Sequence, residues 1–288
     1  MIKTLVTGGA GFIGSNLISE LKKNNYQITS LDNYSTGSKL NEIDGVKYIN
    51  DDILNIKSLN IDVELCFHLA AQSRVQPSFE RPEESFKVNV EGTSRIMEWA
   101  KKNKTRVIYA GSSSKHHDPS DSPYAMYKFL GEEVCKLYKK SYNVNVDIAR
   151  FYNVYGPGEN TDEKYGNVIG IWKTKVIKGE SIPIVGDGEQ KRDFIHVKDV
   201  VDGLIKISQA DINQSDAWEL GSGINYSINQ LYEIFKRKFN VDSINIPDQP
   251  GNYRETLREN DDIIKLLNWH PKDRLKSHIE NLKLWKMY

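Results

Sequence analysis

The sequence predicts an α/β fold, in which helices cover both faces of a doubly wound parallel sheet and a smaller lobe is attached. In the first half of the 288-residue chain, short apolar runs alternate with segments whose apolar residues recur at helical spacing. A glycine-rich turn follows the first apolar run and opens the first helical segment. This alternation is typical of βαβ units, which place successive strands in parallel.

Six short apolar runs are expected to be strands. They cover residues 3–7, 27–32, 46–50, 65–69, 106–110 and 145–150. Helices are expected between them, at residues 13–23, 84–102 and 123–142, where apolar residues follow helical spacing. We therefore expect residues 1–152 to form the sheet domain.

The alternation loosens after about residue 151, where Gly and Pro gather at residues 155–158 and 186–188. Part of the segment 193–220 is expected to return to the sheet domain. Residues 153–192 and 221–288 are expected to form the smaller lobe, so the two lobes interleave in sequence. The chain contains no internal repeat and no low-complexity linker.

The charge balance excludes several classes of partner. Lys and Arg number 39, as do Asp and Glu, so no long-range field favours nucleic acid or an anionic membrane. No stretch reaches the roughly 18 apolar residues of a membrane span, and the first residues already form a strand pattern rather than a signal peptide. We expect a cytoplasmic protein with a small-molecule partner. Cys66 and Cys135 lack metal-ligand spacing and are expected to be reduced core residues.

The glycine-rich turn predicts a dinucleotide site on a Rossmann fold. Glycines at positions 8, 11 and 14 follow the first strand and open the first helix. Glycines allow a tight turn and bring backbone N–H groups to a pyrophosphate, which the positive end of the helix attracts. The residues expected to contact the cofactor here are Gly8, Gly11, Phe12, Ile13 and Gly14.

The ends of the next strands are expected to hold the rest of the cofactor. Asp32 ends the second strand, where a carboxylate accepts hydrogen bonds from ribose hydroxyls and repels a 2′-phosphate, so NAD is preferred to NADP. Asn33 follows it. Asp52 and Ile53 follow the third strand and would contact the adenine, although Asp52 could instead be a solvated loop acid. After His68, the residues Leu69, Ala70 and Ala71 either let the nicotinamide half pass or pack in the core.

A tyrosine and a lysine are the candidate catalytic pair. Tyr124 and Lys128 stand four residues apart on one helical face. A tyrosine with a pKa of about 10 is a poor base at neutral pH, but a neighbouring Lys⁺ and a positive nicotinamide ring would lower that pKa. The serine run Ser112-Ser113-Ser114 lies at the end of the fifth strand, where open α/β sheets bind ligands. A serine hydroxyl there would relay the substrate proton to Tyr124.

The chain resembles the NAD-dependent sugar epimerase/dehydratase family of extended short-chain dehydrogenases/reductases over nearly its whole length. The resemblance is carried by Thr7 to Gly14, Leu31-Asp32-Asn33, His68 to Ala71, Asn89 to Thr93, Ser122 to Lys128, Arg150 to Pro157 and Gly186 to Phe194.

This resemblance implies that Tyr124 is the base, that Lys128 holds the nicotinamide ribose, and that Ser112 assists proton transfer. The smaller lobe would bind a nucleotide sugar. The residues expected to contact this nucleotide sugar are Ser113, Asn153, Asn167, Val168, Arg192, Arg254 and Thr256. Alternatives remain open: Arg192 could be a surface charge, and Asn153 and Asn167 could serve a turn or a helix cap.

The serine run favours one reaction within this family. The family's dehydratases and decarboxylases carry acidic residues after the catalytic Ser or Thr, whereas this chain has Ser113 and Ser114. Asp32 argues against a reductase that consumes NADP. The prediction is a nucleotide-sugar 4-epimerase that uses bound NAD. Alternatives are an NAD(P)-dependent 4-keto-sugar reductase and a non-catalytic NAD-sensing regulator.

The chain departs from the family pattern near the expected sugar site. The loop at 115–123 is about half the usual length and contains His116 and His117, which are expected to be solvated rather than metal ligands. Gln249 stands where the family places a phosphate-binding Arg. Either Arg254 or Arg258 substitutes for that Arg, or both lie at the surface. Val185 replaces a larger residue near the base, which weakens the case for uridine. Thr256 is small at a position that gates the sugar C2 group, and would admit an N-acetyl substituent.

A homodimer is expected, because the segments 84–102 and 123–142 form a four-helix interface in many relatives. The candidate apolar stripe is Phe86, Val90, Met97, Phe129 and Leu137. Such stripes also occur as plain core.

Overall fold

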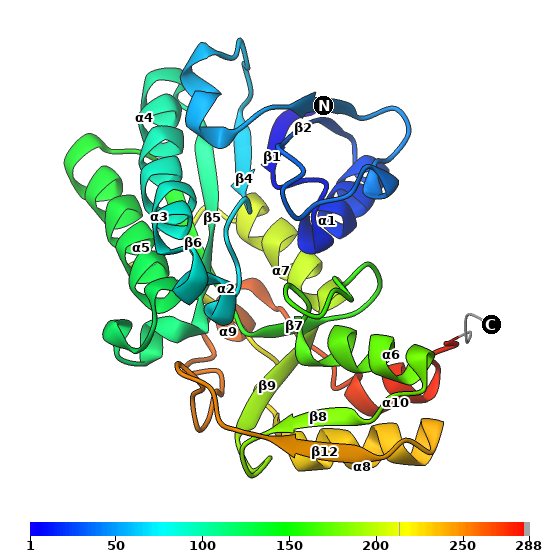
Figure 1. Ribbon diagram of the computed structural model, residues 1–288. Coiled ribbons are helices and arrows are strands. Elements are labelled where there is room, and N and C mark those ends of the chain that lie inside the picture. Colours follow the sequence, from blue (N-terminus) through cyan, green and yellow to red (C-terminus); the bar gives the residue numbers. More distant parts are fainter. Residues whose placement is uncertain (213, 285–288) are drawn as a thin grey trace.

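Seven parallel strands form the central sheet of the computed structural model (Figure 1), which describes residues 1–212 and 214–284. The last four residues of the predicted smaller lobe lie outside this range. The sheet order is β10 (Trp218–Leu220), β6 (Val146–Phe151), β5 (Arg106–Ser112), β4 (Leu65–His68), β1 (Ile2–Thr7), β2 (Tyr26–Asp32) and β3 (Lys47–Asn50). The chain starts near the middle and winds outward in both directions, so the predicted fold class is confirmed.

Side chains on the inner strands alternate between two cores, one on each face of the sheet. Val6, Phe67 and Ile108 face the core that contains α1 (Phe12–Lys23) and α7 (Val197–Gln209). Their neighbours Leu5 and Cys66 face the core beneath α4 (Thr93–Asn103) and α5 (Pro123–Tyr142). Because both faces are covered, these strands are apolar on both sides. Cys66 and Cys135 are buried free thiols, as predicted, and burial raises the pKa of both.

The segment expected to be one helix over 84–102 is interrupted. It consists of α3 (Pro82–Phe86), a π-helical turn (Lys87–Gly92) and α4. The turn contains the buried Asn89, whose amide accepts from the Gln72 main-chain N–H and donates to the Gln72 carbonyl, both at 3.0 Å. This pair of bonds fixes the loop that follows β4. A π-helical turn at such a position is commonly associated with a functional site.

The smaller lobe has its own sheets and core, and lies below the central sheet in Figure 1. Its strands are β7 (Asn153–Tyr155), β8 (Ile182–Val185), β9 (Lys191–His196), β11 (Asn225–Ser227) and β12 (Ser243–Ile246). Its helices are α6 (Val168–Lys178), α8 (Ile228–Phe239) and α10 (Leu275–Glu280). Short helices elsewhere are α2 (Val75–Glu80), α9 (Asp262–Leu267) and the 3₁₀ turns Lys39–Asn41, Ile53–Ser58, Ser113–His116 and Pro119–Asp121.

Two sequence predictions about packing are wrong in part. Ile263 and Trp269, expected in the smaller lobe, are fully buried in the core of the sheet domain, and the Trp269 indole donates to the Asp199 carbonyl at 2.9 Å. Met97, placed in the dimer stripe, is fully buried in the core beneath α4. Phe86 and Leu137 are exposed, so the homodimer remains a prediction that rests on fewer residues. Within the described ranges, no helix has the length and apolarity needed to cross a membrane.

Candidate active site

A cavity of about 530 Å³ lies between the carboxyl edge of the central sheet and the smaller lobe. It is lined by the residues that follow β1 to β6, where open parallel sheets bind ligands. All predicted site residues line this cavity except Arg254. The Arg254 guanidinium is exposed and pairs with Asp187 at 2.9 Å, in the turn after β8, so the structure does not bring it to the site.

The glycine-rich turn has space only for glycine at two positions. Gly8 has a φ of +72°, and a Cβ atom there would stand 2.8 Å from the Ala70 nitrogen. A Cβ atom on Gly14 would stand 2.1 Å from the Gly8 carbonyl oxygen. Among the residues that the structure describes, no side chain caps the N-terminus of α1 at Gly11, and the first turn of α1 contains no acidic residue. The positive end of α1 therefore faces the cavity and is suited to a pyrophosphate.

Substitution of Gly14 by Ala should destabilise the protein by about 1–3 kcal/mol, because the new methyl group overlaps backbone rather than a movable side chain. Urea unfolding of both variants checks this, with Gly11→Ala as the matched control. A Cβ atom on Gly11 would stand 3.2 Å from the same carbonyl, which a small shift relieves. Equal losses of unfolding free energy in the two variants would contradict this account of the turn.

Asp32 is held in place at the cavity wall by the main chain. Its two carboxylate oxygens accept hydrogen bonds from the N–H groups of Ala10 at 2.9 Å and Tyr34 at 2.8 Å. Burial raises the pKa of Asp32, and these two bonds oppose that rise. Asp52 caps the 3₁₀ turn Ile53–Ser58 through the Leu54 N–H at 2.9 Å and accepts from the Asn33 amide at 2.8 Å. It is therefore an ordered part of the cavity wall rather than a solvated loop acid.

The preference for NAD over NADP should depend on the Asp32 charge. Asp32→Asn keeps an acceptor oxygen but removes the repulsion of a 2′-phosphate, so the ratio of NADP to NAD affinity should rise by about tenfold. Fluorescence titration with both dinucleotides measures this ratio. Glu42→Gln is the control, since Glu42 lies outside the cavity and binds the Tyr34 hydroxyl at 2.6 Å. An unchanged ratio of NADP to NAD affinity in Asp32→Asn would show that the carboxylate does not discriminate between the two dinucleotides.

His68, the last residue of β4, links β1 to α4 behind the cavity. Its Nδ1 lies 2.8 Å from the Thr7 hydroxyl and its Nε2 lies 3.3 Å from the Thr93 hydroxyl. Burial lowers the pKa of His68 to about 3, so the ring is neutral at physiological pH. The cavity is lined by Leu69, Ala70 and Ala71, and Ala70 also packs against the core. The two roles considered for this segment, passage of the nicotinamide half and core packing, are therefore compatible.

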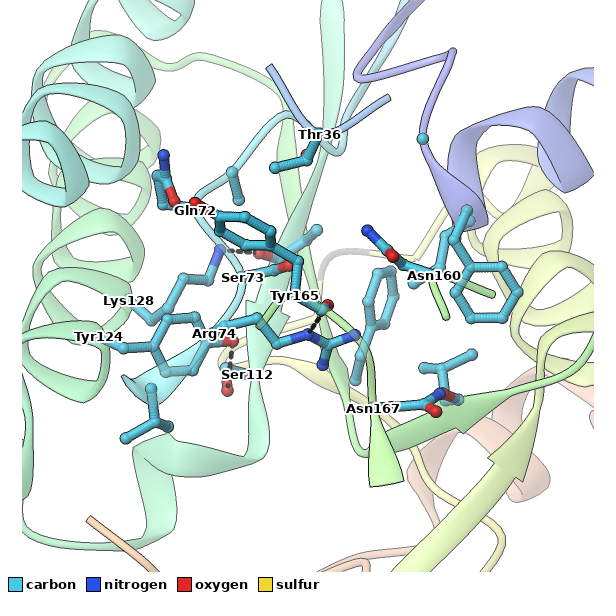
Figure 2. A pocket seen from close by; sticks show the side chains of 18 of the residues that line it. Thr36, Gln72, Ser73, Arg74, Ser112, Tyr124, Lys128, Asn160, Tyr165 and Asn167 are labelled. Atoms are coloured by element: carbon cyan, nitrogen blue, oxygen red, sulfur yellow. Dashed lines mark hydrogen bonds between the residues drawn. The ribbon is translucent and has the colours of Figure 1, made fainter. Parts of the chain in front are cut away.

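Tyr124 and Ser112 meet at the reaction end of the cavity (Figure 2). The Tyr124 hydroxyl donates to the Ser112 hydroxyl oxygen at 3.3 Å, and the Ser114 hydroxyl donates to the same oxygen at 2.9 Å. Ser122 caps α5 by accepting from the Ala125 N–H at 3.1 Å, and Pro123 occupies the first turn. The Ser-Pro start of α5 thus positions Tyr124 in its first turn, beside the end of β5.

Lys128 was the cation predicted to lower the pKa of Tyr124, but in this structure the cation that lowers it is Arg74. Burial raises the pKa of Tyr124, while the Ser112 hydrogen bond and the charge of Arg74 lower it. Lys128 is buried; it donates to the Ala110 carbonyl, and its Nζ lies 4.5 Å from the centre of the Tyr109 ring. Burial lowers the pKa of Lys128 to about 8. Arg74 was not among the site residues predicted from the sequence. The signal that could have identified it is a basic residue shortly after the fourth strand.

The predicted substrate residues on the smaller lobe are largely bound to protein partners. The Asn153 amide donates to the Asp193 carbonyl at 3.2 Å and to the Thr256 hydroxyl at 3.1 Å. Asn167 caps α6 by accepting from the Gly170 N–H at 2.6 Å, the cap role left open above. Arg192 is half-buried rather than a surface charge, and burial lowers its pKa to about 10. Ser113 and Val168 complete the predicted lining residues.

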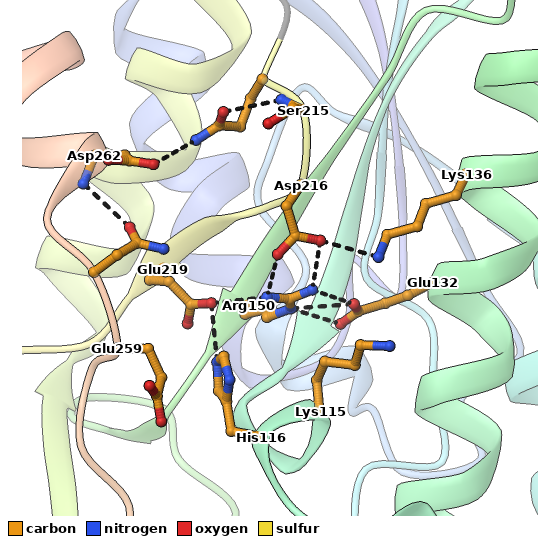
Figure 3. Close-up of polar contacts among 12 residues, drawn as sticks. Lys115, His116, Glu132, Lys136, Arg150, Ser215, Asp216, Glu219, Glu259 and Asp262 are labelled. Carbon is orange, nitrogen blue, oxygen red and sulfur yellow. Dashed lines mark hydrogen bonds and ion pairs between the residues drawn. The ribbon is translucent and has the colours of Figure 1, made fainter.

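The expectation that the two loop histidines are solvated is wrong. His116 Nε2 lies 3.0 Å from Glu219 Oε1, within the buried ionic cluster of Figure 3. The His117 ring stacks on Tyr253, with ring centres 3.9 Å apart and an interplanar angle of 9°. Tyr253 lines the cavity, and its buried hydroxyl has no hydrogen-bond partner among the described residues. The Arg258 guanidinium binds Asp261 and the Gly221 carbonyl, so it does not replace the missing phosphate-binding Arg.

Comparison with known proteins agrees with this geometry. The model of the NAD dependent epimerase/dehydratase family matches residues 4–221. The chain belongs to this family. A relative described as a putative UDP-glucose 4-epimerase, from Methanocaldococcus jannaschii, is 36% identical, and the alignment covers 98% of this chain and 97% of the relative. UDP-glucuronic acid decarboxylase 1 of Xenopus tropicalis is 29% identical over 82% of this chain and 60% of its own length.

Solved structures show the same fold. UDP-glucuronic acid 4-epimerase from Bacillus cereus, in complex with UDP-glucuronic acid and NAD, superposes with a TM-score of 0.89 at 25% identity, covering 97% of each chain. NAD is the cofactor of this family, as the sequence predicted. The open N-terminus of α1 and the carboxylate of Asp32 fit its pyrophosphate and adenosine ribose.

Proposed function

We propose that this protein is a nucleotide-sugar 4-epimerase that inverts C4 by transient oxidation. The observation that carries the proposal is the distribution of acids around the cavity. Within the described residues, its lining carboxylates are Asp32, which ends β2, and Asp51 and Asp52, which follow β3. All three lie at the end of the cavity expected to hold the adenosine. The reaction end offers Tyr124 and the serine run instead. Elimination of water requires a further acid and base there, whereas epimerisation requires one group that exchanges a single proton.

The chain's own residues account for the proton transfers. Tyr124 would take the proton of the C4 hydroxyl, and Ser112, which accepts the phenol hydrogen bond at 3.3 Å, would orient both oxygens. Bound NAD would supply the hydride acceptor for C4 and, in its reduced form, the hydride donor for the opposite face of the sugar. Lys128 would hold the nicotinamide ribose. Tyr124 would then give its proton back, so no net oxidation results.

Rotation of the sugar between the two steps requires the rest of the substrate to stay anchored. Arg192 lies on the smaller lobe and would hold the diphosphate through charge-assisted hydrogen bonds. The predicted partner Asn153 already donates its amide N–H groups to Asp193 and Thr256. Binding energy spent on the nucleotide leaves the sugar ring free to turn. The names of the relatives support a uridine nucleotide and, for the epimerases among them, chemistry at C4.

Incubation of the purified protein with UDP-glucose, UDP-N-acetylglucosamine and UDP-glucuronic acid, without added cofactor, tests the proposal. We expect an equilibrium mixture of C4 epimers by NMR, with no net change in NADH absorbance. In a parallel reaction with added NAD(P)⁺, stoichiometric formation of NAD(P)H and a 4-keto sugar would identify a keto-sugar reductase acting in reverse. Release of CO₂ with a pentose product would identify a decarboxylase, and a lack of turnover with every sugar would favour a non-catalytic role.

A further inference from the structure

We propose that Arg74 recognises a carboxylate on the sugar ring, so that the preferred substrate is a nucleotide-linked hexuronic acid. This inference rests on the proposed function and names the substrate class of the same site. Arg74 lies in the loop between β4 and α2 and lines the cavity. In the view of Figure 2, its guanidinium projects into the space between Tyr124 and Ser112 on one side and Asn160 and Asn167 on the other.

The guanidinium is oriented by one hydrogen bond and keeps two nitrogens free. Its Nε donates to the Tyr165 carbonyl at 2.7 Å, across 91 residues of sequence. This bond fixes the plane of the group. Among the described residues, no protein acceptor binds Nη1 or Nη2. The two nitrogens therefore present a fork toward the cavity, the geometry that binds a carboxylate through two parallel hydrogen bonds.

Arg74 also lacks a counter-ion. Within the described chain, no carboxylate lies within 4 Å of it, whereas its neighbour Arg81 pairs with Glu84 at 2.7 Å and the buried Arg150 contacts three carboxylates. The Arg74 side chain is partly buried, and this burial lowers the pKa of its guanidinium. A partly buried cation without a protein partner is suited to an anionic ligand.

The surroundings of Arg74 distinguish a sugar carboxylate from the substrate diphosphate. The Arg74 guanidinium donates to the Tyr165 carbonyl, whereas the Arg192 guanidinium donates to the Lys191 carbonyl and the Asn252 side chain. The two arginines therefore serve different parts of the cavity. Arg192 would take the diphosphate, and Arg74 stands near the phenol that receives the C4 proton. In a hexuronic acid the carboxylate is attached at C5, the carbon next to C4.

The same contact would protect the carboxylate during the reaction. Oxidation at C4 gives a β-keto acid, in which the C5–C6 bond can break, its electron pair moving toward the C4 carbonyl as CO₂ leaves. The ion pair with Arg74 stabilises the carboxylate but not neutral CO₂. Arg74 would therefore disfavour this loss, and the acid would return to C4 reduction intact.

Calorimetric titration of the Tyr124→Phe protein with UDP-glucuronic acid and UDP-glucose tests the assignment without turnover. We expect the acid to bind at least about tenfold more tightly, and Arg74→Leu in the same background to remove that preference. Arg74→Lys keeps the charge but loses the two parallel hydrogen-bond donors, so it should retain only part of the preference for the acid. Arg81→Leu is the matched control, since Arg81 contacts the Tyr165 hydroxyl from outside the cavity and should leave the preference unchanged.

Equal affinities for the two sugars in the Arg74-containing protein would overturn the assignment, even if the Leu variant failed to fold. An equal loss of affinity for both sugars in Arg74→Leu would place Arg74 on the diphosphate instead. The proposed function fails separately: an acid preference that depends on Arg74, with pentose as the product of the Tyr124-containing enzyme, supports the carboxylate site and contradicts 4-epimerisation. Rapid epimerisation of UDP-glucose without an acid preference contradicts only the carboxylate site.

Discussion

Replacement of Tyr124 by Phe is expected to lower kcat for epimerisation by about 10²–10⁴-fold, the usual contribution of a positioned acid/base group. The change removes one oxygen atom, the donor of the hydrogen bond to Ser112, and leaves the ring in the cavity wall. Affinity for NAD and the thermal unfolding temperature should therefore stay close to those of the unsubstituted protein. Initial rates measured by coupled assay, together with NAD titration, check both expectations.

Tyr127→Phe is the matched control for this substitution. Tyr127 lies three residues further along α5, and its ring packs edge-on against Phe86, with centres 5.5 Å apart, outside the cavity. It should keep full activity. The pH dependence adds a second readout: because the Ser112 hydrogen bond lowers the pKa of Tyr124, Ser112→Ala should move the rising limb of the pH–rate profile to higher pH. Activity of Tyr124→Phe within about threefold of normal would remove Tyr124 from the acid/base role.

Substitution of Arg150 by Met should destabilise the fold by about 3–5 kcal/mol, because it leaves buried carboxylates without their cation. Arg150 lies at the centre of the ionic cluster in Figure 3, 2.9 Å from both Glu132 and Glu219, whose side chains are completely buried. Urea unfolding followed by circular dichroism measures the loss. Lys3→Met is the control, since the Lys3–Asp62 pair is exposed and should contribute less than about 1 kcal/mol. A smaller loss of unfolding free energy in Arg150→Met than in Lys3→Met would contradict the ionic role of Arg150.

The same cluster predicts how stability changes with pH. Burial raises the pKa of Glu219, but its bonds with His116 and Arg150 outweigh burial and lower it. Burial likewise opposes the contacts of Asp216 with Arg150 and Lys136, which lower its pKa to about 2. Carboxylates with lowered pKa values stabilise the fold above their unfolded pKa, near 4, and lose that contribution as the pH falls toward 2. Arg150→Met should flatten this part of the stability curve.

The sheet was predictable because its strands carry their signal locally. Six of its seven strands fall within one or two residues of the expected ranges. Five of these are mostly buried apolar runs, whereas the sixth, β3, lies at the edge of the sheet and is partly exposed. The seventh strand, β10, has only three residues, too few to show a periodic pattern of apolar side chains. The break in the helix over 84–102 depends on the contact between Asn89 and Gln72, which no local pattern encodes.

The site was predictable where a motif fixes its own geometry, as in the glycine turn and the Ser-Pro start of α5. Side chains placed by contacts between residues far apart in sequence were not. Arg74 depends on Tyr165 in the smaller lobe, and the pairing of His116 with Glu219 spans 103 residues. Arg254 looked like a phosphate ligand from sequence, but the β8 turn places Asp187 within reach and holds it at the surface.

Transient oxidation at C4 is tested most directly by a nucleotide sugar that carries deuterium on C4, epimerised in ordinary water without added cofactor. Tyr124 is proposed to remove only the hydroxyl proton, so the deuterium should remain on C4 in both epimers, and mass spectrometry should find the label undiluted. Loss of deuterium to the solvent, or uptake of solvent hydrogen at C4 or C5, would show that a carbon-bound proton is abstracted instead and would contradict the proposed reaction.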